Sequence, residues 1–191
     1  MEFRINKPNP KPTLDVESES CVDLVTDFAK KGKWYMIYLL SKSVSREVSI
    51  LVDSKDNYWI DWGTIGRVEL SPPVGAVLPF KLWVHTHPSN TAYWSVTDRN
   101  TLEIAKGILE KALVLGEDGL LSTTFQPVSS FTDDTEISTL QWTEEEVIDW
   151  MEFNSDDCEN DLRDDFYSYL KLIMSSSKLI PDDFFSNGKY W

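Results

Sequence analysis

Cysteine and histidine are scarce in this chain of 191 residues, which contains two of each. Cys21 and Cys158 stand far apart and in no C-x-x-C pair, so the sequence predicts neither a disulfide framework nor a thiolate zinc site. No apolar run approaches the roughly 20 residues of a membrane-spanning helix. Residues 1–13 are polar and rich in proline, without the apolar core of a signal peptide. We therefore expect a cytoplasmic protein.

Basic residues are also few, with 18 Lys and Arg against 32 Asp and Glu and a net charge of -14. Nearly all of the excess of acidic over basic residues lies between Phe131 and Asp165. This segment contains 14 acidic residues and one basic residue, Arg163. This concentration argues against nucleic acid as the partner of that segment. A solvated acidic face is the simplest interpretation, and a basic partner is the alternative.

The hydrophobic content of 41% is typical of a globular protein with its own core. Apolar positions at helical spacing predict a helix over residues 18–31. The run 34–40 is apolar at nearly every position, which leaves a buried strand and a second helix both open. Residues 46–52 and 58–62 are rich in strand-forming residues and flank a turn cluster at 53–57, so residues 46–62 predict a β-hairpin.

Further along, we expect a short strand at 67–70 and a strand at 81–87. A helix is expected from Val96, with an apolar face extending through Leu102 and Ala105 to Ala112. Residues 112–115 and 120–125 predict a second hairpin. Strands on both sides of a helix indicate an α/β fold of the α+β sandwich type, with a mixed sheet flanked by helices.

Three regions are expected from these patterns. Residues 1–17 form a proline-rich, flexible lead, and residues 18–130 form the main domain. Residues 131–191 form an acidic C-terminal extension that is partly helical. Within the extension, 131–139 reads as a polar connector, and the aromatic residues of 182–191 are candidates for docking on the main domain.

The stretch from Trp83 to Asp98 holds both histidines, and the chemistry of the chain concentrates there. In a strand, His85 and His87 project from the same face, and Pro88 then ends the strand because it lacks an N–H. The chain then continues to Ser95-x-x-Asp98, which brings a carboxylate back toward the two histidines. Two imidazoles and one carboxylate suit a zinc ion whose fourth position is left to water. A packed pair of histidines and a simple helix cap are the structural alternatives.

These residues resemble a known motif. His85-x-His87-Pro88 followed by Ser95-x-x-Asp98 is similar to the JAMM motif of the MPN-plus zinc metalloproteases, and the resemblance covers roughly residues 18–126. It implies an MPN-like fold and cleavage of isopeptide or peptide bonds, as in deubiquitinase-like enzymes. The substrate it implies is a ubiquitin-like protein, whose C-terminal tail is held as an added strand.

The resemblance also assigns roles. His85, His87 and Asp98 become zinc ligands, and Ser95 stabilises the oxyanion of the tetrahedral intermediate. The motif requires a glutamate on an upstream strand as general acid/base. Glu47 fits this place because it opens a strand-like segment, whereas Glu69 precedes a Ser-Pro-Pro break and matches no part of the motif.

Three aromatic residues, Trp83, Tyr93 and Trp94, flank the motif, either as packing or as walls of a groove for an extended peptide. The rival to an enzyme is a catalytically inactive MPN-type scaffold that binds partners without zinc. A second rival places the main function in the acidic extension, which would imitate nucleic acid for a basic partner. No feature of the chain predicts binding to a membrane or to nucleic acid.

Overall fold

The described part of the chain, residues 14–63, 73–132, 135–153 and 168 of the computed structural model, begins with two helices. Helix α1, Glu19–Lys30, confirms the first predicted helix and buries its apolar face. Helix α2, Trp34–Val44, resolves the ambiguous run in favour of a helix. Its buried residues lie on more than one side of the helix, which explains why the sequence shows no polar face. These buried residues are Met36, Ile37, Tyr38, Leu40 and Ser41.

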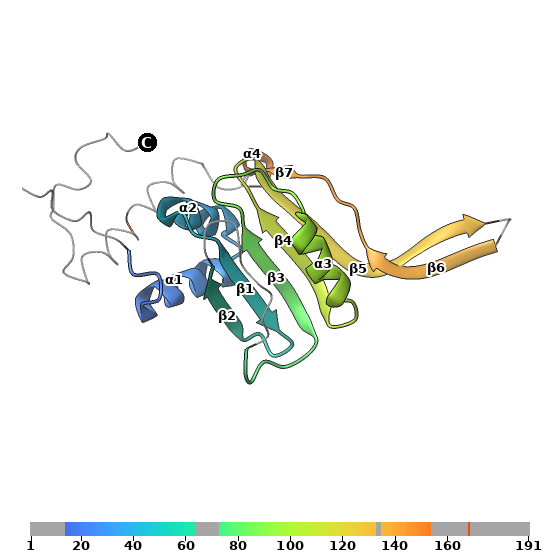
Figure 1. Ribbon diagram of the computed structural model, residues 1–191, viewed down its shortest axis with the longest axis horizontal. Coiled ribbons are helices and arrows are strands. Elements are labelled where there is room, and N and C mark those ends of the chain that lie inside the picture. Colours follow the sequence, from blue (N-terminus) through green and yellow to red (C-terminus); the bar gives the residue numbers. More distant parts are fainter. Residues whose placement is uncertain (1–13, 64–72, 133–134, 154–167, 169–191) are drawn as a thin grey trace, which may run out of the picture.

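A mixed sheet forms the centre of the molecule (Figure 1). Its strands are β1 (Val48–Asp53), β2 (Tyr58–Trp62), β3 (Phe80–Thr86), β4 (Leu109–Leu115), β5 (Gly119–Thr132), β6 (Thr135–Trp142) and β7 (Ile148–Asp149). The order is β2-β1-β3-β4-β5-β6, and β7 pairs with β5. Strands β3 and β4 are parallel and all other pairs are antiparallel. Both predicted hairpins are therefore confirmed.

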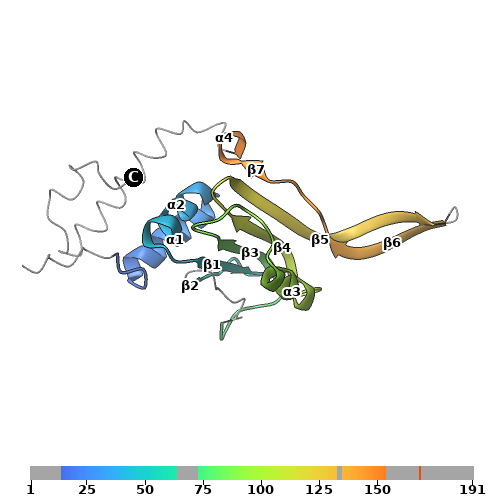
Figure 2. The ribbon, with the colours of Figure 1, turned by 45° about the horizontal axis from the view of Figure 1, so that its top comes forward.

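Helices cover both faces of this sheet. Helices α1 and α2 lie on one face and α3, Val96–Ile104, lies on the other (Figure 2). The alternation of side chains along the strands matches this arrangement. Val84 packs with the residues of α1 and α2, whereas Trp83 packs with Leu102 of α3. The mixed α/β class predicted from the sequence is confirmed.

The extent of α3 differs from the prediction. The helix ends at Ile104, Gly107 adopts a positive φ of 80°, and β4 begins at Leu109. The predicted helical face through Ala112 is therefore wrong beyond Ala105. Leu109 and Ala112 pack in the same cluster as α3, so their spacing imitates a helical face although they belong to a strand.

The polar connector expected at 131–139 is also wrong. Strand β5 continues to Thr132 and β6 starts at Thr135, and the two pair from Phe125 opposite Trp142 to Thr132 opposite Thr135. This β5–β6 arm, residues 125–142, extends away from the rest of the sheet (Figure 1). The two strands pair along their backbones, and such pairing does not require an alternation of apolar residues.

Part of the acidic extension packs on the sheet. Helix α4, Trp150–Phe153, follows β7, and the indole of Trp150 is buried against Tyr35 and Tyr38 of α2. The helical spacing expected to include Val147 and Ile148 is wrong there, because Ile148 and Asp149 form β7. Nearly all of the extension after Phe153 lies outside the described residues, as do the strand expected at 67–70 and the aromatic C-terminus. Every helix described is too short or too polar to cross a lipid bilayer.

Candidate metal centre

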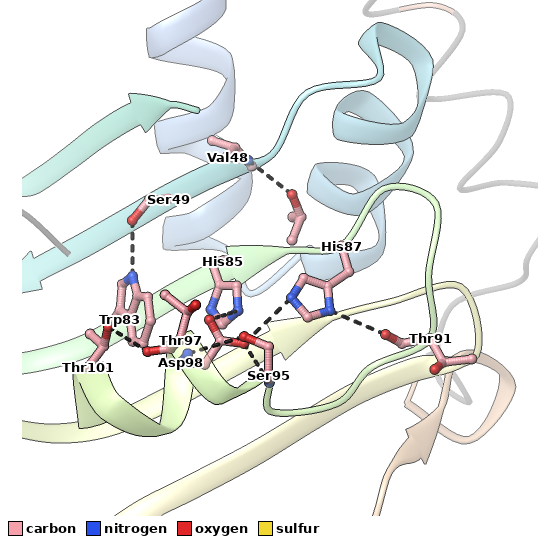
Figure 3. A network of polar contacts seen from close by, with 11 residues as sticks. Val48, Ser49, Trp83, His85, His87, Thr91, Ser95, Thr97, Asp98 and Thr101 are labelled. Atoms are coloured by element: carbon pink, nitrogen blue, oxygen red, sulfur yellow. Dashed lines mark hydrogen bonds and ion pairs between the residues drawn. The ribbon is translucent and has the colours of Figure 1, made fainter. Parts of the chain in front are cut away.

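The two histidines sit at the end of β3, in the centre of the sheet. His85 is opposite Ser49 of β1 and is 1% exposed, and His87 directly follows the strand and is also buried. Both imidazoles point toward Asp98 (Figure 3). The Nε2 atom of His85 lies 3.3 Å from Asp98 Oδ1, and the Nε2 atom of His87 lies 3.7 Å from Asp98 Oδ2.

Asp98 reaches this point because of the way α3 begins. Ser95 is the N-cap, and its hydroxyl accepts a hydrogen bond of 3.2 Å from the backbone N–H of Asp98. In return, Asp98 Oδ2 accepts a hydrogen bond of 2.8 Å from the backbone N–H of Ser95. This capping box fixes the first turn of the helix. The predicted cap is confirmed, and the same carboxylate that caps the helix faces the histidines.

Together these three residues can hold a metal ion. Their potential ligand atoms all lie within 4.8 Å of one another, and all three side chains are buried. Neither ring nitrogen of His85 has a hydrogen-bond partner among the described residues, and its Nε2 atom lies 3.3 Å from Asp98 Oδ1. Buried polar atoms normally have a partner, and a metal ion beside Asp98 would supply one for Nε2.

The electrostatics of the site favour a cation. Burial lowers the pKa of His85, against the opposing effect of Asp98, so its neutral, metal-binding form prevails. Burial would also lower the pKa of His87, but its contacts with Asp98 and the charge of Glu47 raise it overall. Burial would raise the pKa of Asp98, yet the histidines and Ser95 hold it well below its usual range. An ionised carboxylate therefore faces both imidazoles.

The orientation of His87 is set by the loop that follows it. Its Nδ1 atom lies 3.4 Å from the carbonyl oxygen of Thr91 (Figure 3). A carbonyl can only accept a hydrogen bond, so this contact places the proton on Nδ1. In the neutral ring the lone pair of Nε2 then faces Asp98, which is the tautomer that a metal ligand needs.

Glu47 stands immediately before β1 and is 6% exposed. Because Ser49 lies opposite His85 in an antiparallel pair, a step of two residues along each strand brings Glu47 beside His87 on the α3 face. The charge of Glu47 contributes to the raised pKa of His87, as this proximity requires. The rival carboxylate, Glu69, lies outside the described residues.

Sequence reasoning missed the residues that hold Glu47 in place. The backbone N–H of Val48 donates to the hydroxyl of Thr86 at 3.0 Å, and the hydroxyls of Thr86 and Ser41 are 2.6 Å apart. The Ser41 hydroxyl donates to the carbonyl oxygen of Arg46 at 2.6 Å. The peptide groups on both sides of Glu47 are thus tied to β3 and α2. The available signal was weak: Ser41 directly follows the apolar run of α2 and is buried with it.

Replacing Thr86 with valine should lower the free energy of unfolding by about 1–3 kcal/mol, because the buried N–H of Val48 would lose its acceptor. Urea denaturation of the parent and the variant measures the difference. Thr97→Val, at an exposed position of α3, is the matched control and should change stability by less than about 0.5 kcal/mol. Equal effects of the two substitutions would contradict the role given to Thr86.

The predicted aromatic neighbours surround the histidines. Trp83 stacks on His85 at a centroid distance of 4.6 Å, and its indole N–H donates to Ser49 Oγ at 3.0 Å. Trp94 lies 5.9 Å from His85, and Tyr93 lies 4.8 Å from His87. Trp83 is buried and therefore packs the site, whereas Tyr93 is 45% exposed and offers its ring to solvent beside the histidines.

Comparison of the chain with protein-family models, with curated proteins and with solved structures finds no match. The interpretation of the centre therefore depends on its own geometry. Two imidazoles and a carboxylate converge in a buried position, with a further buried glutamate beside one of them. Such a set can bind a metal ion and can move a proton next to it.

Proposed function

We propose that the chain is a zinc-dependent hydrolase of the JAMM type, built on an MPN-like fold. Its substrate would be an isopeptide or peptide bond at the C-terminal tail of a ubiquitin-like protein. The observation that carries the proposal is the buried group of His85, His87 and Asp98 with Glu47 beside it. The motif that these residues form supports the family, and their convergence supports the metal.

The donor set suits zinc. Neutral imidazole nitrogen and carboxylate oxygen are common zinc ligands, and three protein ligands with one open position are typical of catalytic zinc. Calcium and magnesium prefer sites made of oxygen atoms alone, which the two histidines do not provide. When bound, zinc would lower the pKa of a water molecule and polarise the carbonyl group of the scissile bond.

The side chains of the protein then account for the proton transfers. Glu47 would accept a proton from the water molecule while the oxygen of the water bonds to the carbonyl carbon. It would return that proton to the nitrogen of the scissile bond as the C–N bond breaks. The products are a free amine and a carboxylic acid at the end of the tail, which loses its remaining proton to solvent. Ser95 Oγ accepts from a backbone N–H, so its own hydrogen can be donated to the carbonyl oxygen as negative charge develops there.

Removal of the metal tests this proposal. Purified protein should contain zinc and should cleave a ubiquitin-like protein joined to a lysine side chain. A chelator should abolish cleavage and added zinc should restore it, while circular dichroism confirms that the chelated protein remains folded. Cleavage that persists without metal would contradict the proposal. Bound zinc without cleavage of isopeptide or linear substrates would also contradict it, and the absence of both zinc and cleavage would favour the scaffold that binds partners without zinc.

A further inference from the structure

The peptide group between Thr91 and Ala92 makes a contact at each of its ends. Its carbonyl oxygen lies 3.4 Å from Nδ1 of His87. Its N–H donates a hydrogen bond of 2.7 Å to Oδ1 of Asp118, in the turn between β4 and β5. A peptide group is planar, so the carboxylate that holds the N–H also fixes the direction of the carbonyl that meets the histidine.

The loop after His87 rests directly on this turn. The backbone N–H of His87 donates to the carbonyl of Leu115 at 2.7 Å, and the N–H of Glu117 donates to the carbonyl of Asn90 at 2.9 Å. A Cβ atom at Gly116 would stand only 2.0 Å from the backbone nitrogen of Ala92. Only glycine therefore allows so close an approach, and the loop has little freedom to move toward the turn.

The turn is fixed from its other side by the C-terminal segment. The indole N–H of Trp150 donates to the carbonyl of Gly116 at 3.0 Å. Strand β7 pairs with Gly119 and Leu120, next to the turn, and both β7 and α4 lie at this end of β4 and β5 (Figure 1). Asp118 thus projects from a turn that is held on both sides.

We propose that Asp118 is a positioning residue for the candidate metal ligand His87, acting through the Thr91–Ala92 peptide. Ligand histidines commonly donate their second ring N–H to a carboxylate or a carbonyl, which fixes the tautomer and the direction of the ring. Here a carbonyl is the direct acceptor, and Asp118 strengthens it by accepting from the same peptide group. This role rests on the proposed function, since it concerns the same metal centre.

Metal affinity measures this role without reference to catalysis. Zinc affinity, determined by competition with a chromophoric chelator, should be about 10- to 100-fold weaker in Asp118→Ala than in the parent. Asp118→Asn should stay within a few-fold of the parent, because the amide oxygen can accept from the same N–H. Asp61→Ala removes an exposed carboxylate from β2 and is the matched control, with unchanged affinity.

Nitrogen NMR of the histidine rings, recorded at a pH where His87 is neutral, gives a second readout that does not depend on zinc binding. In the metal-free parent, His87 should carry its proton on Nδ1, and Asp118→Ala should shift the ring toward a mixture of tautomers. Equal zinc affinity of the parent and Asp118→Ala would overturn the role of Asp118, as would a proton on Nε2 of His87 in the parent. A parent that binds no zinc would instead overturn the proposed function.

Discussion

Glu47→Gln is expected to lower the rate of bond cleavage by about 10²- to 10⁴-fold, the range typical of a lost general acid/base. Glutamine has nearly the shape of glutamate but cannot take up a proton at neutral pH. The side chain is buried next to His87, and its peptide neighbours stay tied through Thr86 and Ser41. The variant should therefore remain folded and keep its zinc.

Single-turnover cleavage of an isopeptide-linked substrate, together with zinc analysis of the same sample, measures this effect. Glu110→Gln, at an exposed position of β4, carries the same chemical change and should cleave at the parent rate. Undiminished cleavage by Glu47→Gln would exclude Glu47 as the general base. Loss of zinc from that variant would mean that Glu47 is a ligand instead.

The second large effect is expected at Asp98. Loss of a residue that only hydrogen-bonds to a metal ligand typically weakens metal binding by ~10- to 100-fold. Asp98→Asn, which alters a ligand itself, should weaken zinc binding by more than this, and the rate of cleavage should fall accordingly. Asparagine can still accept the hydrogen bond from the Ser95 N–H that closes the capping box. It cannot supply the anionic oxygen that zinc prefers, nor the charge that now faces both histidines. Isothermal titration with zinc measures the difference.

Ser95→Ala separates the cap from the metal site. The substitution removes the acceptor for the Asp98 N–H and should cost about 1 kcal/mol of stability, while zinc binding stays within a few-fold of the parent. Asp98→Asn should instead bind little zinc, although its amide oxygen can keep the hydrogen bond from the Ser95 N–H. If Asp98→Asn bound zinc as tightly as the parent, Asp98 would be a cap and nothing more.

The candidate centre could be predicted because its determinants are local in sequence. Alternation in a strand placed the two histidines toward one side, and the spacing of Ser95 and Asp98 defined a cap whose carboxylate turns back to them. The prediction that Glu47 lies beside the histidines required only that the segment containing it pair with β3. The fold class was predictable for the same reason, because hairpins and amphipathic helices leave periodic patterns.

The remaining features depend on contacts between distant segments. Thr86 and Ser41 meet only after α2 has packed on the sheet, and nothing near Asp118 in the sequence indicates that it holds the loop beside His87. The burial of Trp150 likewise depends on α2 and on the turn at Gly116. The β5–β6 arm was missed because its paired segments do not show the alternation of apolar and polar residues that marks a half-buried strand.

X-ray absorption spectroscopy of the purified, zinc-loaded protein decides whether both histidines bind zinc, because it identifies the atoms around the metal. We predict one zinc ion per chain, with two imidazole nitrogens and carboxylate or water oxygen at about 2.0–2.2 Å. The imidazole signal should disappear in a His85→Ala/His87→Ala double variant. A shell without imidazole in the parent, sulfur ligands at about 2.3 Å, or no tightly bound zinc would contradict the account.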